Sequence, residues 1–196
     1  MTTSTREEIL VAALAVLSEG GYRKTSIDAV AERAGLTRQG VLHYFPSKKL
    51  LLLAVIQRRH ELNRAHLLQH GDKDWPSQLA EVVAFEERNP GLAELHNVLM
   101  AESVTGNEAA RQYFHAHYQV AHEQIVAQFE ERYGEHLPSG LTPRTAATAL
   151  LAMLDGIQLQ WMLDREQTDH PRIMREVWSV LLGPTGTLET LETRPG

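Results

Sequence analysis

Residues 25–45, TSIDAVAERAGLTRQGVLHYF, constrain the fold most, because they contain two short helical patterns separated by one glycine. The first pattern has an apolar face at the i, i+3, i+4, i+7 spacing of an amphipathic helix, formed by Ile27, Val30, Ala31 and Ala34. Gly35 suits the left-handed position that follows a helix end. In the second pattern Val41 and Phe45 are four residues apart and are expected to point inward.

The same stretch predicts where its two helices begin. Thr25 is the expected N-cap of the first helix, with Asp28 three residues later in the capping-box position. Thr37 is the expected N-cap of the second helix, which Pro46 closes. Two short helices joined by a tight turn with glycine form a helix-turn-helix, whose second helix enters the DNA major groove. An ordinary helical hairpin gives the same local pattern, so the flanking residues must decide between them.

Nearly every other segment also predicts a helix, and no segment predicts a strand, so the expected fold class is all-α. Residues 6–19 place apolar side chains on one face before Gly20 and Gly21 end the run. Further helices are expected over residues 47–68, 76–89, 92–105, 107–133, 143–163 and 171–182. The first three helices would form a DNA-binding domain over residues 1–46, followed by a helical domain over 47–183 and a flexible tail over 184–196.

The composition excludes several classes of function. The chain has 196 residues, of which 43% are hydrophobic, and no cysteine, which rules out disulfides, thiolate metal sites and a cysteine nucleophile. No stretch approaches 18 consecutive apolar residues, and the N-terminus lacks the pattern of a signal peptide. These features predict a soluble cytoplasmic protein that makes no contact with a membrane.

The charge is unevenly distributed along the chain. Residues 1–49 contain seven Lys or Arg against five Asp or Glu, a net charge of +2, whereas the whole chain carries −6 and the remainder therefore −8. This distribution indicates that only the N-terminal residues, about 1–49, bind a polyanion. Lys48 and Lys49 would be the first helical residues after the Ser47 cap, where each opposes the helix dipole at a cost of roughly 0.3–1 kcal/mol. A DNA phosphate bound there would relieve that cost.

Residues 6–50 resemble the DNA-binding domain of the TetR family of bacterial transcriptional regulators. The resemblance rests on the Thr25-Ser26 opening, on IDAVAERAGL through the turn, and on HYFPSK leading into the next helix. It implies a homodimer in which each protomer has a three-helix head, a connecting fourth helix, and a C-terminal helical domain that binds a small molecule and dimerises. The chain departs from the family at Gln39, Gly40, Leu42 and Lys49; Leu42 replaces a tyrosine that usually contacts phosphate.

The chemistry of the side chains assigns roles at the DNA. Arg38 could bind guanine bidentately and Gln39 adenine, each pair discriminating by roughly 1–3 kcal/mol, while Gly40 allows close approach. His43 could serve as a base or a phosphate contact. Phosphate contacts, which set register rather than sequence, are expected from Thr25, Thr37, Tyr44, Lys48 and Lys49. Ser26 completes the expected DNA-binding residues.

Two helices expected in the domain over residues 47–183 have apolar residues on more than one face. The segment 143–163 and the last helix could bury these faces against a second chain in a four-helix interface, although burial in the chain's own core is the alternative. The expected dimer residues are Leu150, Leu154, Ile157, Trp161, Met174, Val177 and Leu181. A pocket for an unidentified small molecule is expected to be lined by Phe85, Leu95, Leu99, Met100, Tyr113, His117 and Trp161.

No pattern indicates a metal, a cofactor or an enzyme. His66 and His70 are four residues apart and could share a metal, but they suit a solvated helix end better. The chain has no Gly-rich phosphate loop and no nucleophile elbow. The sequence thus predicts a ligand-responsive transcriptional regulator, and the resemblance favours a repressor over an activator. Two alternatives are a DNA-bound protein without a sensor, and a helical binding protein whose head no longer binds DNA.

Overall fold

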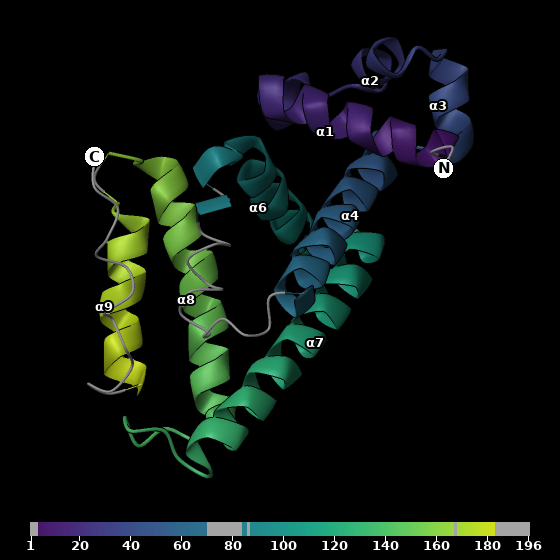
Figure 1. Ribbon diagram of the computed structural model, residues 1–196. Helices are drawn as coiled ribbons and strands as arrows, with labels where there is room; N and C mark the ends of the chain where they lie inside the picture. Colours follow the sequence, from purple (N-terminus) through teal and green to yellow (C-terminus); the bar gives the residue numbers. More distant parts are fainter. Residues whose placement is uncertain (1–3, 70–83, 86, 167, 183–196) are drawn as a thin grey trace. The chain divides into compact units, whose positions relative to one another are not determined.

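The structure is a computed structural model that describes residues 4–69, 84–85, 87–166 and 168–182 (Figure 1). Within these residues the regular structure is entirely helical, which confirms the predicted all-α class. The helices are α1 (Thr5–Lys24), α2 (Ile27–Ala34), α3 (Arg38–Tyr44), α4 (Lys48–Gln69), α6 (Pro90–Val104), α7 (Glu108–Tyr133), α8 (Pro143–Leu163) and α9 (His170–Leu182). The tail predicted over 184–196 and most of the helix predicted over 76–89 lie outside the described residues.

The chain divides into two compact units, an N-terminal unit over Met1–Phe114 and a C-terminal unit over His115–Gly196. The N-terminal unit contains the predicted three-helix head together with α4, α6 and the first turns of α7. The C-terminal unit contains the rest of α7 with α8 and α9. The boundary between a DNA-binding domain and a helical domain, expected between residues 46 and 47, stays a prediction, because the two compact units are separated by their packing and not by their function.

Helix α1 begins as predicted but bends where the sequence places its glycine pair. Gly21 has φ 71° and ψ 179°, a conformation that side chains with a Cβ rarely adopt, and a last turn follows it to Lys24. The backbone N–H of Tyr22, just after the bend, donates to Oε2 of Glu94 in α6 at 3.1 Å. This hydrogen bond, made just after the bend, attaches the end of α1 to α6.

The N-cap of α2 is Ser26, so the predicted cap at Thr25 is wrong. The Ser26 hydroxyl accepts the backbone N–H of Ala29 at 3.1 Å. Thr25 is the C-cap of α1, and its hydroxyl donates to the carbonyl oxygen of Gly21 at 2.9 Å. Because the Thr25 hydroxyl already donates to a backbone carbonyl at the end of α1, the hydroxyl of the next residue, Ser26, caps α2.

The turn between α2 and α3 has the predicted geometry. Gly35 is left-handed, with φ 66° and ψ 28°, and its N–H donates to the carbonyls of the preceding helical turn. Thr37 caps α3 by accepting the N–H of Gly40 at 3.0 Å. Val41 and Phe45 are buried, as the sequence predicted. The exposed residues of α3 are Arg38, Gln39, His43 and Tyr44, all of which carry polar groups.

Helices α4 and α6 complete the N-terminal unit. Ser47 caps α4 as predicted, since its hydroxyl accepts the N–H of Leu50 at 3.2 Å. The first turns of α4 bury a continuous apolar run, Leu51, Leu52, Leu53, Ala54, Val55 and Ile56. Near the start of α6, a Cβ built on Gly91 would stand 2.6 Å from the carbonyl oxygen of Leu17. The missing side chain of Gly91 is thus what allows α6 to lie so close to α1.

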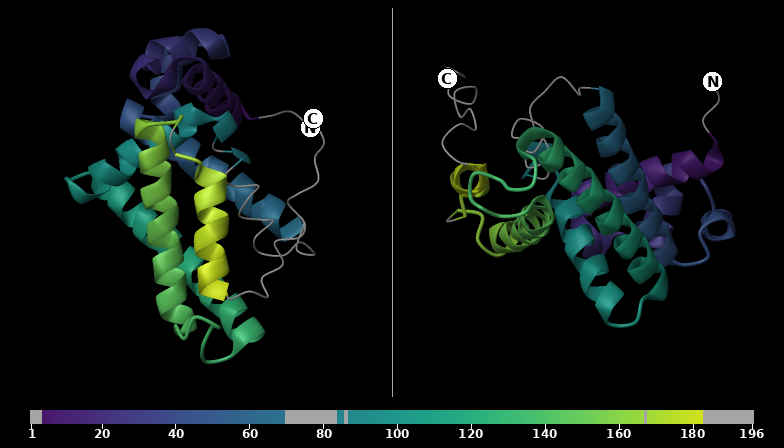
Figure 2. Two further views of the ribbon diagram at one scale, coloured as in Figure 1. Left: turned by 90° about the vertical axis from the view of Figure 1, so that its left-hand side faces the viewer. Right: turned by 90° about the horizontal axis from the view of Figure 1, so that it is seen from below.

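In the C-terminal unit α8 and α9 lie side by side (Figure 2). Thr142 caps α8 by accepting the N–H of Thr145 at 3.3 Å, and Pro143 takes the first helical position, both as predicted. The ring of Phe129 in α7 lies 6.2 Å from the ring of Trp178 in α9. The core of this unit is therefore shared by all three of its helices.

Candidate nucleic-acid interface

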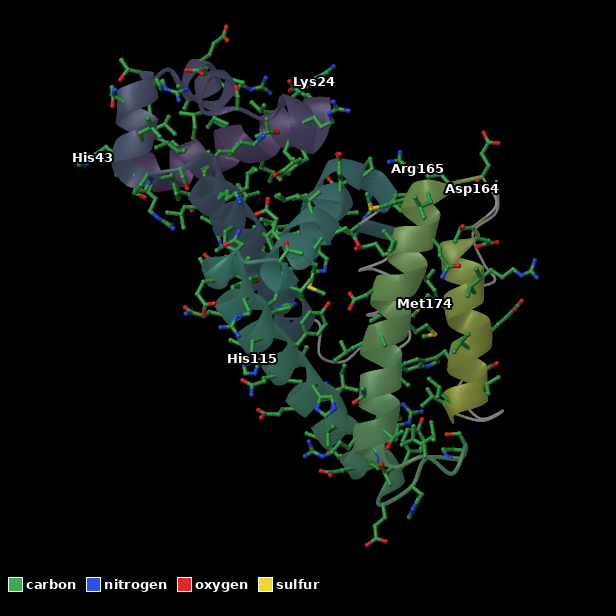
Figure 3. All side chains as sticks on the ribbon, turned by 180° about the vertical axis from the view of Figure 1, so that it is seen from behind. Lys24, His43, His115, Asp164, Arg165 and Met174 are labelled. Atoms are coloured by element: carbon green, nitrogen blue, oxygen red, sulfur yellow. The ribbon has the colours of Figure 1, made fainter. Side chains whose placement is uncertain are left out.

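Helix α3 is divided into a buried side and an exposed side. Val41 and Phe45 are 0% and 3% exposed and anchor the helix in the head. Figure 3 shows the labelled side chain of His43 projecting away from the head. Of the predicted contacts on α3 and its cap, all are exposed except the partly exposed Gly40: Thr37, Arg38, Gln39, His43 and Tyr44. The sequence therefore predicted correctly which side of this helix faces solvent.

Arg38 makes an ion pair with Asp28 of α2. Its Nη1 donates to Oδ2 of Asp28 at 2.6 Å, and the two side chains are 54% and 68% exposed. The sequence indicated Asp28 only as a capping-box residue and gave no sign of this pair. The guanidinium is thus held at the start of α3 by a partner from the preceding helix.

The two lysines at the start of α4 have partners inside the N-terminal unit. Lys48 Nζ donates to the carbonyl oxygen of Tyr22 at 3.2 Å and lies 4.6 Å from the centre of its ring. Lys49 Nζ lies 3.4 Å from Oε2 of Glu102 in α6. These contacts stabilise the ammonium groups against the helix dipole in the absence of DNA, which the sequence alone did not reveal.

The two remaining predicted DNA contacts lie before α2. Thr25 is 1% exposed, so its hydroxyl is not presented at the surface. Ser26 is partly exposed, and its hydroxyl already accepts a backbone N–H. Leu42, which stands where the family usually has tyrosine, is also partly exposed. The exposed candidates for DNA contact are consequently concentrated on α3 and at the start of α4.

The residues predicted to line a ligand pocket fall in both units. Leu95 and Leu99 are 0% and 1% exposed in the core of the N-terminal unit. The other members there are partly exposed: Phe85, Met100 and Tyr113. In the C-terminal unit, His117 is partly exposed and Trp161 is buried beneath the guanidinium of Arg165.

Sequence reasoning missed a polar and aromatic cluster around Tyr113. His60 Nδ1 lies 2.5 Å from the Tyr113 hydroxyl oxygen, and the His60 ring meets the His96 ring edge-on at 5.6 Å. His96 also packs edge-on against Phe114 at 5.2 Å. Nearby in sequence, the buried Arg59 guanidinium lies 5.4 Å from the Phe85 ring centre. No hydropathy pattern marks such residues, because polar side chains are expected outside the core.

The predicted dimer residues are mostly part of the chain's own core. Five are buried within the single chain: Leu150, Ile157, Trp161, Met174 and Leu181. Leu154 and Val177 are partly exposed. Figure 3 shows Met174 on the side of α9 that faces α8. The strongly exposed apolar residues of these helices are instead Leu159, Leu163 and Val180, at 47%, 80% and 72%.

The histidines considered as metal ligands do not form a described site. His70 and the side chain of His66 lie outside the described residues, and His115 is exposed. No group of three or more His, Asp or Glu side chains in the described parts of the chain could hold a metal ion. Among the helices that the structure describes, α8 is long and apolar enough to cross a membrane by length and composition alone, and 33% of its apolar 18-residue stretch is buried.

Two family descriptions match the chain. Residues 9–55 match the bacterial regulatory proteins of the tetR family, which covers α1 to the first turns of α4. Residues 77–178 match the C-terminal domain of BetI-type transcriptional repressors. The second match alone spans more than half of the chain, so the likeness includes the body as well as the head.

Individual relatives agree with these matches. The nucleoid occlusion factor SlmA of Marinobacter nauticus is 28% identical over 153 residues, 74% of each chain. The transcriptional repressor KstR of Mycolicibacterium smegmatis is 45% identical over 56 residues, but this spans only 29% of the chain and 28% of KstR. The structure of SmeT, a multidrug efflux repressor of Stenotrophomonas maltophilia, superimposes with a TM-score of 0.66 at 24% identity, covering 99% and 98% of the two chains. The chain is a DNA-binding transcriptional regulator and belongs to the TetR family of bacterial regulatory proteins.

Proposed function

We propose that the protein is a homodimeric repressor that binds a palindromic operator and is released from it by a small molecule. The observation that carries this proposal is the division of α3, which buries Val41 and Phe45 and exposes a row of polar side chains. A short helix that is anchored on one side and polar on the other suits the major groove.

The exposed row supplies both kinds of DNA contact. Arg38 and Gln39 can each make a bidentate pair with a base edge, and Gly40 lets the backbone of α3 come close to the groove. His43 extends the same row as a base or phosphate contact. Thr37, Tyr44, Lys48 and Lys49 would hold phosphates, with Ser26 contributing from the start of α2.

The C-terminal helices support a dimer. Leu159, Leu163 and Val180 are exposed apolar side chains on α8 and α9, and two such helices from each chain would form a four-helix interface. Leu154 and Val177 are the two predicted dimer residues that the chain itself leaves partly exposed. A twofold dimer would place two heads on half-sites about 34–36 Å apart, which explains why the operator should be palindromic.

The cluster around Tyr113 is our candidate for part of the effector site. It combines aromatic rings with polar atoms that can orient a small ligand, within the same unit as the head. Structural neighbours support a ligand-responsive role, since SmeT is described in complex with triclosan and EbrR with imidazole. An effector that binds better to the DNA-free conformation must weaken DNA binding, and DNA must weaken effector binding equally.

This function needs no catalytic group or cofactor and places the protein in the cytoplasm, where its DNA is. A second candidate is DNA binding without an effector, because one relative, SlmA, is described as a nucleoid occlusion factor and not as a ligand-responsive regulator. The two candidates differ in a single respect, because only a repressor of the first kind changes its operator affinity when a small molecule binds.

The test begins with selection of bound duplexes from a random library, followed by gel shifts on the selected site. We expect two protomers per duplex. Arg38→Ala should relax the preference at one base pair in each half-site, by roughly 1–3 kcal/mol. Lys49→Ala should weaken all duplexes similarly and reduce the salt slope by about one for each protomer, which is about two for the dimer.

Arg111→Ala is the matched control, because it removes the same charge from an arginine that is 66% exposed on α7. It should leave both sequence preference and salt slope unchanged. Failure of the protein to select any sequence would refute the proposed function. A selected site whose affinity responds to no compound in a screen of aromatic and drug-like molecules would support the second candidate.

A further inference from the structure

The carboxylate of Glu102, near the end of α6, has partners from two directions. Its Oε2 accepts the Nδ2 amide of Asn107 at 2.9 Å and lies 3.4 Å from the ammonium of Lys49. Glu102 is 23% exposed, whereas Lys49 is 64% exposed. The carboxylate is therefore the more enclosed member of the ion pair, and the lysine is the member that solvent or a DNA phosphate can reach.

Glu102 also faces Tyr22, at the end of α1. Burial of the Tyr22 ring raises the pKa of its phenol above the ordinary value of 10, and the negative charge of Glu102 raises this pKa further, in part through a hydrogen bond. The positive charge of Lys49 acts in the opposite direction. The side chains of Tyr22, Lys49 and Glu102 thus form one electrostatic cluster where α1, α4 and α6 meet.

The position of Glu102 is set by the attachment of α6 to α1. Gly91 lies against the carbonyl of Leu17, and Glu94 accepts the N–H of Tyr22. Both contacts are made by the first turns of the same helix that carries Glu102. The carboxylate consequently has a fixed place beside the head, and any rearrangement of α6 changes its distance to Lys49.

We propose that Glu102 competes with a DNA phosphate for Lys49 and so lowers the affinity of the protein for its operator. This inference rests on the proposed phosphate role of Lys49. A carboxylate and a phosphodiester are both anions that one ammonium can bind, but Lys49 cannot serve both at full strength. DNA binding therefore replaces the Glu102 pair, and a conformation of α6 that strengthens the pair disfavours DNA.

The expected size of the effect follows from the exposure of the pair. Pairs of this kind are screened by water and contribute little, so their loss corresponds to roughly a 1.4- to 5-fold change in an equilibrium constant. Removing the competitor should therefore raise operator affinity by about that factor per protomer, or roughly 2- to 30-fold for a dimer that uses both heads.

The experiment measures operator affinity for four variants of the full-length protein, which are Glu102→Gln, Glu102→Asp, Lys49→Met and the double variant of Lys49→Met with Glu102→Gln. Glu102→Gln keeps the shape and an oxygen that can accept from Asn107 but removes the charge, and should bind the operator more tightly. Glu102→Asp keeps the charge but withdraws it from Lys49 by one methylene, and should produce part of the same increase. In the background of Lys49→Met, Glu102→Gln should have no effect.

The outcomes separate competition from its alternatives. An equal gain from Glu102→Gln with and without Lys49 would mean general repulsion between Glu102 and DNA, and would overturn the inference. Unchanged affinity of both Glu102 variants beside a wild-type protein that binds its operator would also overturn it, while leaving the proposed function intact. Loss of the proposed function shows differently, because the wild-type protein itself would then bind no selected duplex. Melting temperatures identify any variant that fails to fold, in which case the other Glu102 variant decides.

Discussion

Replacing Gly91 with alanine tests the close approach of α6 to α1. Gly91 is buried, and a Cβ at this position would lie 2.6 Å from the carbonyl oxygen of Leu17, whereas ordinary contacts begin at 3.4 Å. The obstacle is backbone, so it cannot be relieved by a change of rotamer. The two helices must separate locally by about 0.8 Å, the difference between those distances, or distort.

The cost of this change can be estimated from overpacking in other proteins. Inserting a methyl group into a closely packed site typically costs about 1–3 kcal/mol of the free energy of unfolding. Alanine recovers up to about 1 kcal/mol in a helix interior, but Gly91 is the second residue of α6, where that gain is small. For a chain of this size the melting temperature should therefore fall by roughly 2–12 °C.

Gly156→Ala provides the matched control, since Gly156 lies within α8 and its added Cβ would have no atom within 4 Å. Counting the contacts of the single chain alone, this variant should be more stable than the wild type, by about 0.8–1 kcal/mol. Both melting temperatures can be measured by far-ultraviolet circular dichroism at one protein concentration, because the stability of a dimer depends on concentration. A Gly91→Ala protein that melts at or above the wild-type temperature would refute the close-contact argument.

Two further predictions concern residues of the DNA-binding head. The raised pKa of Tyr22 favours its neutral form in the folded protein, so this group contributes stability below its unfolded pKa of about 10, and that stability is lost as pH rises towards the folded value. In alkaline unfolding, Tyr22→Phe should lack that loss, and identical pH profiles for the two proteins would contradict the prediction. Ser26→Ala should lower the free energy of unfolding by about 0.5–2 kcal/mol in urea denaturation, because it removes the N-cap of α2, and a neutral result would mean that Ser26 is not the cap.

The parts of the fold that depend on local signals were predictable from the sequence. Gly35, Thr37 and Ser47 each act through backbone groups within four residues, so residue type and spacing were enough to locate two helix starts and one helix end. Thr25 and Ser26 show the limit of such reasoning. Either of these adjacent hydroxyls could cap α2, and the choice depends on the Gly21 carbonyl of α1, which accepts a hydrogen bond from the Thr25 hydroxyl.

The rest of the site depends on contacts between residues far apart in sequence. The exposed side of α3 could be predicted from the four-residue spacing of the buried Val41 and Phe45. The partners of Lys48 and Lys49 come from α1 and α6, so the local sequence pattern does not indicate them. The same holds for α8, where apolar residues occur on several faces. Periodicity showed that the helix needs much burial, but not that Leu150 and Ile157 face the chain's own core while Leu159 and Leu163 remain outside.

The hydrogen bond between Tyr22 and Glu94 has a consequence for the order in which the protein forms during synthesis. The two residues are 72 positions apart, and at about 5–20 residues per second the ribosome adds the second roughly 4–14 s after the first. During that interval α1, α2 and α3 have all their local caps but lack the carboxylate that accepts the Tyr22 N–H. The nascent head therefore acquires this attachment only when the start of α6 has emerged.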